Sequence, residues 1–349
     1  MENNRLVIFV DDDNNFLIQI NKNGLYESMD LERLILEFEK LGYVVEKKFF
    51  SDFNPNDNYK GVPILYHITE DAFVLYKSYV EDIINFLQKQ GAIMMPNCDY
   101  ARAHHNKVYM EMLRSEFDDE ELKTIKTKFF GNAEEALNAS EKIEYPAVIK
   151  PASGAGSWGV SLAYNASEYK EKVKNICRGT FYRTGKEWLK IVVKKFLLAA
   201  HVREYKFDKF FSKLIVQTFV PNLNGDYKVL YFADKYYTLK RLNRDNDFRA
   251  SGSGKLFPVP DEEVEGLLNF AKKVVNQIDF CMIGMDIGFD GEKYHLLEFQ
   301  MVHMGPYTLT RSEYYHVNNQ DGTWSKVLSK SDLEEEFARS IDVYIKGHK

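Results

Sequence analysis

Apolar and polar residues alternate along the first hundred positions in blocks that predict strands and helices in turn. A short apolar run at residues 6–10 predicts a buried strand, and apolar residues at helical spacing in 31–41 predict an amphipathic helix. Asp30 stands where a helix N-cap is expected, and Gly42 stands where that helix would end. Further strands are predicted at 43–50, 63–68 and 92–95, with a helix at 74–90. Such alternation predicts a parallel sheet covered by helices, which is an α/β domain.

The pattern changes near residue 104, after which strands follow one another more closely. The predicted strands are 127–130, 147–150, 160–163, 214–218, 227–232, 236–242, 282–289 and 294–299. The predicted helices are 107–114, a segment after Asn132, 262–277 and 332–345. Neighbouring strands without helices between them are typical of an α+β region. The sequence therefore predicts an α/β amino-terminal domain followed by a larger α+β part.

Composition narrows the class of protein. The 349 residues are 45% hydrophobic and 28% charged, which excludes a disordered chain and predicts two or three domains. The net charge of −6 disfavours nucleic acid and anionic membranes as partners. No apolar stretch reaches 18 residues and residues 1–16 do not resemble a signal peptide, so no membrane span is expected. Three distant cysteines without a CxxC pair favour a reduced, cytoplasmic setting without a zinc site.

One glycine-rich segment lies between two predicted strands, 147–150 and 160–163. Residues 154–159 read Gly-Ala-Gly-Ser-Trp-Gly, and glycines at this spacing let backbone N–H groups approach phosphate oxygens. A strand follows the loop, whereas the dinucleotide fingerprint opens a helix. No Gly-Lys-Ser/Thr is present for a P-loop, and Lys150 precedes the loop where a protein kinase places its lysine afterwards. An ordinary loop and a phosphate-binding hairpin rooted at Lys150 are the interpretations that remain.

The order strand, Lys-Pro, glycine loop, strand resembles the phosphate-binding segment of the ATP-grasp superfamily, in particular carboxylate–amine ligases such as glutathione synthetase and the ribosomal-protein glutamate ligase. His105-Asn106-Lys107 is similar to an earlier superfamily lysine, and Gln-Thr-Phe-Val-Pro at 217–221 is similar to the hinge that holds adenine. Asn106 and Gln217-Thr218 depart from the acidic residues common there. The resemblance implies nucleotide contacts by Lys107, Lys150, Gly154, Gly156, Ser157, Trp158, Gly159, Gln217, Thr218, Phe219, Val220 and Asp226.

The resemblance extends to two arginines. Arg241 and the Asp-Phe-Arg segment that ends at Arg249 resemble residues that face the γ-phosphate and the acyl phosphate in these ligases. Fixed guanidinium groups stabilise the charge that develops on a transferring phosphoryl group. The alternative is that both arginines are surface residues paired to Asp245 and Asp247. On the basis of the resemblance, Arg241 and Arg249 are expected to be catalytic.

Carboxylates on two successive predicted strands predict a metal site. Asp286 lies on strand 282–289 and Glu298 ends strand 294–299, and a turn at Asp290-Gly291 would bring them together. Gln300 lies two residues beyond Glu298 and projects from the same face of an extended strand. Oxygen ligands of this kind suit Mg²⁺, with Mn²⁺ as an alternative. Superfamily members usually carry Asn where this chain has Gln300, and a structural role for the three residues is the competing interpretation.

A basic segment at 176–213 matches nothing in the resemblance. It holds ten basic and three acidic residues, so its net charge is +7 and the remainder of the chain carries −13. An amphipathic helix packed on the core is one interpretation, because charged and apolar residues each repeat every four positions there. An electrostatic collar for an anionic substrate is the other. His303 and the run Asp11–Asp13 are likewise open between structural and substrate-binding roles.

The resemblance implies a complete function. We expect an ATP-grasp fold with an amino-terminal Rossmann-like domain at 1–103, a central subdomain at 104–215 and a metal-bearing carboxyl subdomain at 216–349. The implied reaction is ATP- and Mg²⁺-dependent, ADP-forming joining of a carboxylate to an amine through an acyl phosphate. The substrate would be a sugar acid, amino acid or peptide, and a homodimer is an open assembly. A small-molecule kinase and an inactive nucleotide-binding module on the same fold are the alternatives.

Overall fold

The computed structural model describes residues 4–17, 19–20, 26–68, 75–154, 157, 159–177, 212–244, 247–249 and 255–347. The chain divides into two compact units, which are described separately. The first unit comprises Met1–His104, Leu113–Thr124 and Asn222–Lys349, and the second comprises His105–Met112 and Ile125–Pro221. The three-part division at 103 and 215 remains a prediction.

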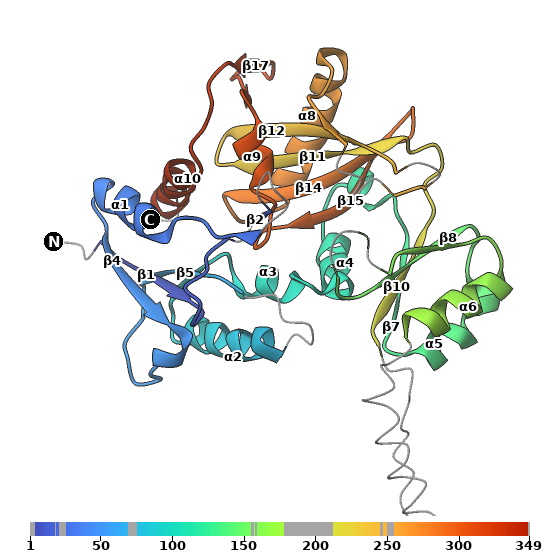
Figure 1. The fold of residues 1–349 in the computed structure, drawn as a ribbon, viewed down its shortest axis with the longest axis horizontal. Coiled ribbons are helices and arrows are strands. Elements are labelled where there is room, and N and C mark those ends of the chain that lie inside the picture. The colour runs from blue at the N-terminus through green and yellow to red at the C-terminus, as the bar shows by residue number, and fades with distance from the viewer. Residues whose placement is uncertain are drawn as a thin grey trace, which may run out of the picture. The chain divides into compact units, whose positions relative to one another are not determined.

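The amino-terminal part of the first unit is a four-stranded parallel sheet with the order β4-β1-β5-β6 (Figure 1). Its strands are β1 (Arg5–Val10), β4 (Val44–Phe49), β5 (Pro63–Tyr66) and β6 (Ile93–Met95). Its helices are α1 (Leu31–Lys40), α2 (Leu75–Lys89) and α3 (Cys98–Ala103), with a 3₁₀ turn η1 (Phe50–Asp52) and a two-stranded ribbon of β2 (Gln19–Ile20) and β3 (Tyr26–Glu27). The apolar run of β1 is completely buried, and Asp30 caps α1 by accepting from the Arg33 N–H. The α/β prediction for this region is confirmed.

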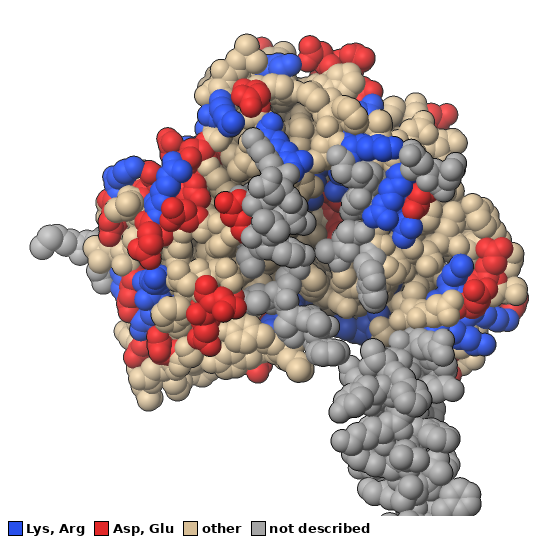
Figure 2. All heavy atoms as spheres, viewed as in Figure 1, with Lys and Arg blue, Asp and Glu red and all other residues tan. Residues whose placement is uncertain are grey.

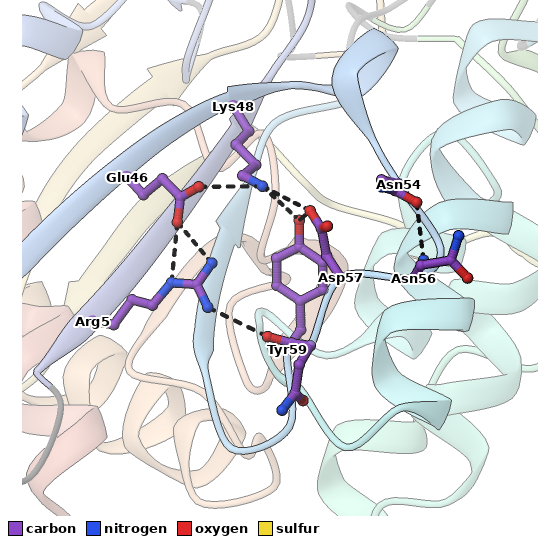
Figure 3. A network of polar contacts seen from close by, with 8 residues as sticks. Arg5, Glu46, Lys48, Asn54, Asn56, Asp57 and Tyr59 are labelled. Atoms are coloured by element: carbon purple, nitrogen blue, oxygen red, sulfur yellow. Dashed lines mark hydrogen bonds and ion pairs between the residues drawn. The ribbon is translucent and has the colours of Figure 1, made fainter.

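A polar network closes the outer edge of this sheet at β4 (Figure 3). Arg5 donates to Glu46 through Nε at 3.0 Å and Nη2 at 2.7 Å. Lys48 Nζ donates to Asp57 and to the Tyr59 hydroxyl, both at 3.0 Å. Charged side chains on an edge strand also disfavour pairing with another sheet.

The carboxyl-terminal part of the first unit is built on a second, mainly antiparallel sheet with the order β15-β14-β11-β12-β16-β17, and β13 pairs with β12. Its strands are β11 (Gly225–Phe232), β12 (Lys235–Leu242), β13 (Leu256–Phe257), β14 (Met282–Phe289), β15 (Tyr294–Gln300), β16 (Tyr315–Asn318) and β17 (Trp324–Val327). Its helices are α8 (Asp261–Val275), α9 (Tyr307–Arg311) and α10 (Leu333–Gly347), and the 3₁₀ turn η2 (Glu120–Lys123) lies beside β15. α10 packs against α1, which joins the two sheets of this unit.

The second unit contains a four-stranded sheet with the order β7-β10-β8-β9. Its strands are β7 (Thr127–Phe130), β8 (Ala147–Pro151), β9 (Ser161–Ala163) and β10 (Leu214–Thr218), and its described helical elements are α5 (Ala133–Asn138), η3 (Ser140–Lys142) and α6 (Ala166–Ile176). α4 (Lys107–Ser115) begins in this unit. The antiparallel pairs in both units confirm the α+β prediction for the region after residue 104. Most of the basic segment, residues 178–211, lies outside the described residues.

Charged side chains of both signs are interspersed over α1 and α10 in Figure 2. Arg33 there pairs with Asp332 and Glu334. No helix within the described ranges is long and apolar enough to cross a membrane. The three cysteines (Cys98, Cys177 and Cys281) are buried and form no disulfide.

Candidate functional site

The glycine-rich loop connects β8 to β9 in the second unit and turns tightly. Ser157 has a φ of 60° and Gly159 a φ of 73°, both in the left-handed region. A Cβ atom on Gly159 would lie 2.9 Å from Pro151 Cγ, so the loop passes close to the end of β8. Glycine is needed at position 159 for both reasons. Gly156 and Trp158 lie outside the described residues.

Lys107 begins α4 and points toward the start of this loop. Its backbone N–H donates to the Ala152 carbonyl at 2.8 Å, and its Nζ donates to the Gly154 carbonyl at 2.8 Å. Lys150 is half-buried on β8, opposite Ile215 of β10. The structure thus brings Lys107 and the glycine loop into contact, although the sequence analysis identified them in separate segments.

The segment similar to an adenine-binding hinge ends β10. Gln217 is buried, and its Nε2 donates at 3.1 Å to the Thr127 hydroxyl, which in turn donates to Glu111 at 2.9 Å. The Thr218 hydroxyl accepts from the Lys126 N–H at 3.2 Å. Half-buried Phe219 and Val220 follow. The side chains of Gln217 and Thr218 therefore hydrogen-bond to β7 and the residue before it.

In the first unit, four charged residues form a cluster on β11, β12 and β14, in which Asp226 and Arg241 are buried and Lys228 and Asp286 are half-buried. Arg241 binds Asp226 through two hydrogen bonds, Nε to Oδ1 and Nη2 to Oδ2, both at 2.6 Å. Its Nη2 also donates to Asp286 Oδ2 at 2.6 Å, and Lys228 Nζ donates to Asp286 Oδ1 at 3.1 Å. Strand pairing fixes these contacts, because Asp226 lies opposite Arg241 and Lys228 lies opposite Asp286. The alternative that Arg241 is a surface residue paired to Asp245 or Asp247 is wrong.

The two aspartates of this cluster differ in protonation behaviour. Burial raises the pKa of Asp226 above its ordinary value, against the hydrogen bonds that it accepts from Arg241. Burial acts in the same direction on Asp286, but two cations, Arg241 and Lys228, outweigh it and lower the pKa. Asp286 is therefore held ionised, which is the form that ligates a metal ion.

Glu298 lies on the neighbouring strand β15, which brings it near Asp286 as expected from the sequence, and a register shift between Asp286 and Ile287 places the two residues directly opposite each other. Gln300 Nε2 donates to Glu298 Oε1 at 3.1 Å, so these two side chains share a face. Among the described residues no three His, Cys, Asp or Glu side chains gather into a metal site. Two carboxylates with an amide oxygen nevertheless fit Mg²⁺, which commonly completes its coordination with phosphate oxygens and water. Each Asp286 oxygen already accepts one hydrogen bond and keeps a second lone pair.

Arg249 has a different environment from Arg241. It pairs with Asp247, through Nε at 2.9 Å to Oδ1 and Nη2 at 2.6 Å to Oδ2. The hydrogen bonds from Arg249 lower the pKa of Asp247. For Arg249 the structure thus contains the ion pair that the sequence analysis gave as the alternative to a catalytic role.

Lys228 is the charged member of the cluster that the sequence analysis missed. Its ammonium lies 5.8 Å from the centre of the Tyr307 ring, and a Cβ on Gly305 would lie 2.9 Å from its Cε. The signal was present, because Asp226 and Lys228 are two residues apart and share one face of β11. The run after β1 behaves as a turn, since Asp11 accepts from the Asn15 N–H at 3.0 Å.

Known proteins are similar to this chain in sequence and in fold. The family model described as carbamoyl-phosphate synthase L chain, ATP binding domain, matches residues 109–207. Alpha-aminoadipate–LysW ligase LysX of Sulfolobus acidocaldarius is 25% identical over 274 residues, which is 76% of this chain and 85% of that protein. The carbamoyl phosphate synthase large chain, N-terminal section, of Aquifex aeolicus is 38% identical over 64 residues, which is 18% of this chain and only 12% of that relative.

Two solved structures share the fold at low sequence identity. D-cycloserine synthetase DcsG has a TM-score of 0.54 and 14% identity, with coverage of 97% of this chain and 99% of that one. The ADP complex of purK, an N5-carboxyaminoimidazole ribonucleotide synthetase, has a TM-score of 0.52 and 10% identity, with coverage of 98% and 78%. The chain thus shares the ATP-grasp fold of these structures, and its residues 109–207 are similar to the ATP-binding domain of carbamoyl-phosphate synthase.

Proposed function

We propose that the chain is an ATP- and Mg²⁺-dependent, ADP-forming ligase that joins a carboxylate to an amine. The observation that carries the proposal is the largely buried cluster in which Arg241 and Lys228 hold Asp286 ionised, with Glu298 directly opposite. Burying several charges costs free energy that a purely structural role would not require. Such an arrangement is suited to a metal ion and to a transferring phosphoryl group.

Each predicted site residue has a role in this proposal. Lys107, Lys150 and the backbone of the glycine-rich loop would bind the phosphates, and residues 217–220 would bind adenine. Asp286, Glu298 and Gln300 would hold Mg²⁺ or Mn²⁺, which neutralises phosphate charge when bound. Arg241 would face the transferring group. Arg249 would do so only after it leaves Asp247, with which it is paired here.

The proposed reaction has two steps. A substrate carboxylate oxygen attacks the γ-phosphorus of ATP, and ADP leaves with the electron pair of the broken bond. The amine then attacks the acyl carbon, phosphate leaves, and the amine nitrogen loses a proton. A pre-positioned guanidinium stabilises the charge on the transferring oxygens without reorganising during the reaction. The buried Asp226 keeps Arg241 in place through two hydrogen bonds.

The acid and the amine are proposed only as classes. The similar alpha-aminoadipate–LysW ligase, whose name contains a carboxylate compound, supports a carboxylate substrate without identifying it. A sugar acid, an amino acid or a peptide would serve, and the net charge of +7 at 176–213 favours an anionic substrate. A cytoplasmic setting, a homodimer and the absence of nucleic-acid partners remain predictions.

The test is phosphate release by the purified full-length chain with ATP and Mg²⁺. A ligase releases phosphate only when an acid and an amine are both present, and the product contains a new amide bond. A panel of sugar acids, amino acids and peptides with and without an added amine makes the comparison. A stable phosphorylated product from one acceptor would identify a kinase instead. If the chain binds ATP but releases no phosphate with any member of the panel, the inactive nucleotide-binding module is favoured.

The metal site is tested by isothermal titration of ATP with and without Mg²⁺. We expect Asp286→Asn and Glu298→Gln to weaken the Mg²⁺-dependent part of ATP affinity at least tenfold, because each removes a charged oxygen ligand. Glu263→Gln is the matched control, since this carboxylate on α8 pairs with Lys240. Affinity like that of the unmodified protein in both site variants would exclude these residues as ligands.

A further inference from the structure

The parallel sheet of the first unit reverses its direction of winding between β1 and β5. The chain runs from β1 to its neighbour β4 on one side and returns to β5 on the other side of β1. In open sheets of this type, the carboxyl ends of the strands at such a reversal leave a crevice where ligands bind. Residues 11–17 follow β1 and His67 follows β5, so both segments lie at this point.

His67 bridges the two strand ends and is almost completely enclosed. It is 2% exposed, and its Nδ1 accepts from the Leu17 N–H at 3.2 Å. Leu17 has a φ of 46°, a left-handed conformation that is costly for a leucine. The other ring nitrogen of His67, Nε2, has no hydrogen-bond partner among the described residues.

The protonation state of His67 follows from these contacts. Burial, with a smaller contribution from His303, lowers the pKa of His67 well below its ordinary value, so the ring is neutral at pH 7. A nitrogen that accepts from a backbone N–H carries no proton, and the single proton of the neutral ring therefore sits on Nε2. Nε2–H is then a buried donor, and leaving it unpaired costs about 1–3 kcal/mol.

The surroundings of this donor are apolar. The pocket lined by His67 lies wholly in the first unit and contains no Lys, Arg, Asp or Glu side chain. Four methionines contribute to its walls, namely Met95, Met282, Met301 and Met304. Its cavity volume is about 20 Å³, room for one water molecule. Methionine has three rotatable bonds and adapts to different occupants, so these walls can admit a somewhat larger group.

The same walls connect the pocket to the candidate metal strand. Met301 directly follows Gln300, and the Met304 carbonyl lies so close to Gly284 that a Cβ there would be 2.3 Å away. His303 Nε2 donates to the Ile68 carbonyl at 2.9 Å, and its ring lies 4.8 Å from that of His67. The segment that follows the metal strand therefore forms one side of the His67 pocket.

We propose that the His67 pocket binds a small uncharged part of the substrate, which accepts a hydrogen bond from Nε2–H through a carbonyl, hydroxyl or ether oxygen. An uncharged group suits the pocket because its walls contain no Lys, Arg, Asp or Glu, and burial opposes the protonation of His67 that could compensate an anion. The inference rests on the proposed function only in naming the occupant as substrate. Recognition by one donor in an apolar enclosure gives strong discrimination against analogues that lack the acceptor.

The test uses two probes of equal shape, acetone and 2-methylpropene, which differ in the acceptor oxygen. The full-length chain labelled with ¹³C-methyl methionine is titrated with each probe and followed by NMR. We expect saturable shifts of the four wall methionines and about fivefold tighter binding of acetone, the effect of one hydrogen bond. Equal binding of the two probes would overturn the proposal, and so would unshifted methionine signals, which would leave a single water as the occupant.

Two substitutions of His67 separate its nitrogens. His67→Asn keeps an acceptor near Nδ1 for Leu17 and removes the donor at Nε2, so it should abolish the preference for acetone. His67→Gln places an amide donor near Nε2 and should retain it. His316→Asn, at another buried histidine outside the pocket, is the control and should retain it too. A preference for acetone that survives in His67→Asn would refute the role of Nε2–H. These measurements need no turnover, so a failed phosphate-release assay leaves them interpretable.

Discussion

Replacing Arg241 with methionine removes the guanidinium that holds together the charged cluster of the first unit. The guanidinium donates three hydrogen bonds at 2.6 Å to two carboxylates. Asp226 and Arg241 are 6% and 7% exposed, so water cannot replace the lost bonds. Methionine retains most of the side-chain volume, and the change therefore acts mainly through charge and hydrogen bonding.

The expected loss is large because the substitution leaves a carboxylate buried without its partner. Removing one member of a buried ion pair typically costs about 3–5 kcal/mol of unfolding free energy. Arg249→Met is the matched control. Its pair with Asp247 has side chains 28% and 18% exposed, and a pair so accessible to solvent is worth about 1 kcal/mol or less. The two variants remove the same chemical group and should differ by about 2–4 kcal/mol.

The assay is urea unfolding followed by circular dichroism at pH 7 and again between pH 5 and pH 3. In the unmodified protein, Arg241 and Lys228 lower the pKa of Asp286, which contributes stability that is lost as the pH falls through the folded-state pKa. Without Arg241 the carboxylates can take up protons, so the difference from the unmodified protein should shrink as the pH falls. Equal, small effects of Arg241→Met and Arg249→Met would show that the cluster is not a buried ion network.

Three further perturbations test other parts of the structure. Gly284→Ala should lower the unfolding free energy by about 2 kcal/mol or more through overpacking, because its Cβ would lie 2.3 Å from the Met304 carbonyl oxygen. Gly347→Ala is the control, because a Cβ there meets nothing within 4 Å. Equal melting temperatures of the two variants would contradict the close approach at Gly284. Gly159→Ala should weaken ATP binding with little loss of stability, measured by titration calorimetry, because the loop would be displaced from Pro151. Burial lowers the pKa of His316 from 6.5 to about 4. As the pH is lowered from 6.5 to 4, the unfolded chain takes up a proton that the folded protein does not, so the unfolding free energy should fall by up to about 1.4 kcal/mol per pH unit. His316→Gln should flatten this pH dependence in urea unfolding experiments.

Local pattern was sufficient for much of the fold. The apolar run 6–10 was predicted to be a buried strand, and all five residues are fully buried in β1. Asp30 was expected to cap a helix, and it does, because an N-cap depends on residues within one turn. The turn at Asp290-Gly291 was enough to predict that Asp286 and Glu298 lie on paired strands. Their direct opposition depends on a register shift between Asp286 and Ile287, because an unbroken register from the turn would place Leu297 opposite Asp286.

Other features needed the tertiary structure because their partners are distant in sequence. Lys228 lies beside Asp286 only because β11 pairs with β14, 58 residues further along the chain. His67 and His303 are 236 positions apart in the sequence, and their rings meet only because distant segments of the first unit pack together. Periodicity records which face of an element is buried, but it carries no information about which distant element covers that face. The sequence by itself thus determined many of the elements and the types of chemical group, and the long-range strand pairing decided which charges meet and which histidine faces an apolar pocket.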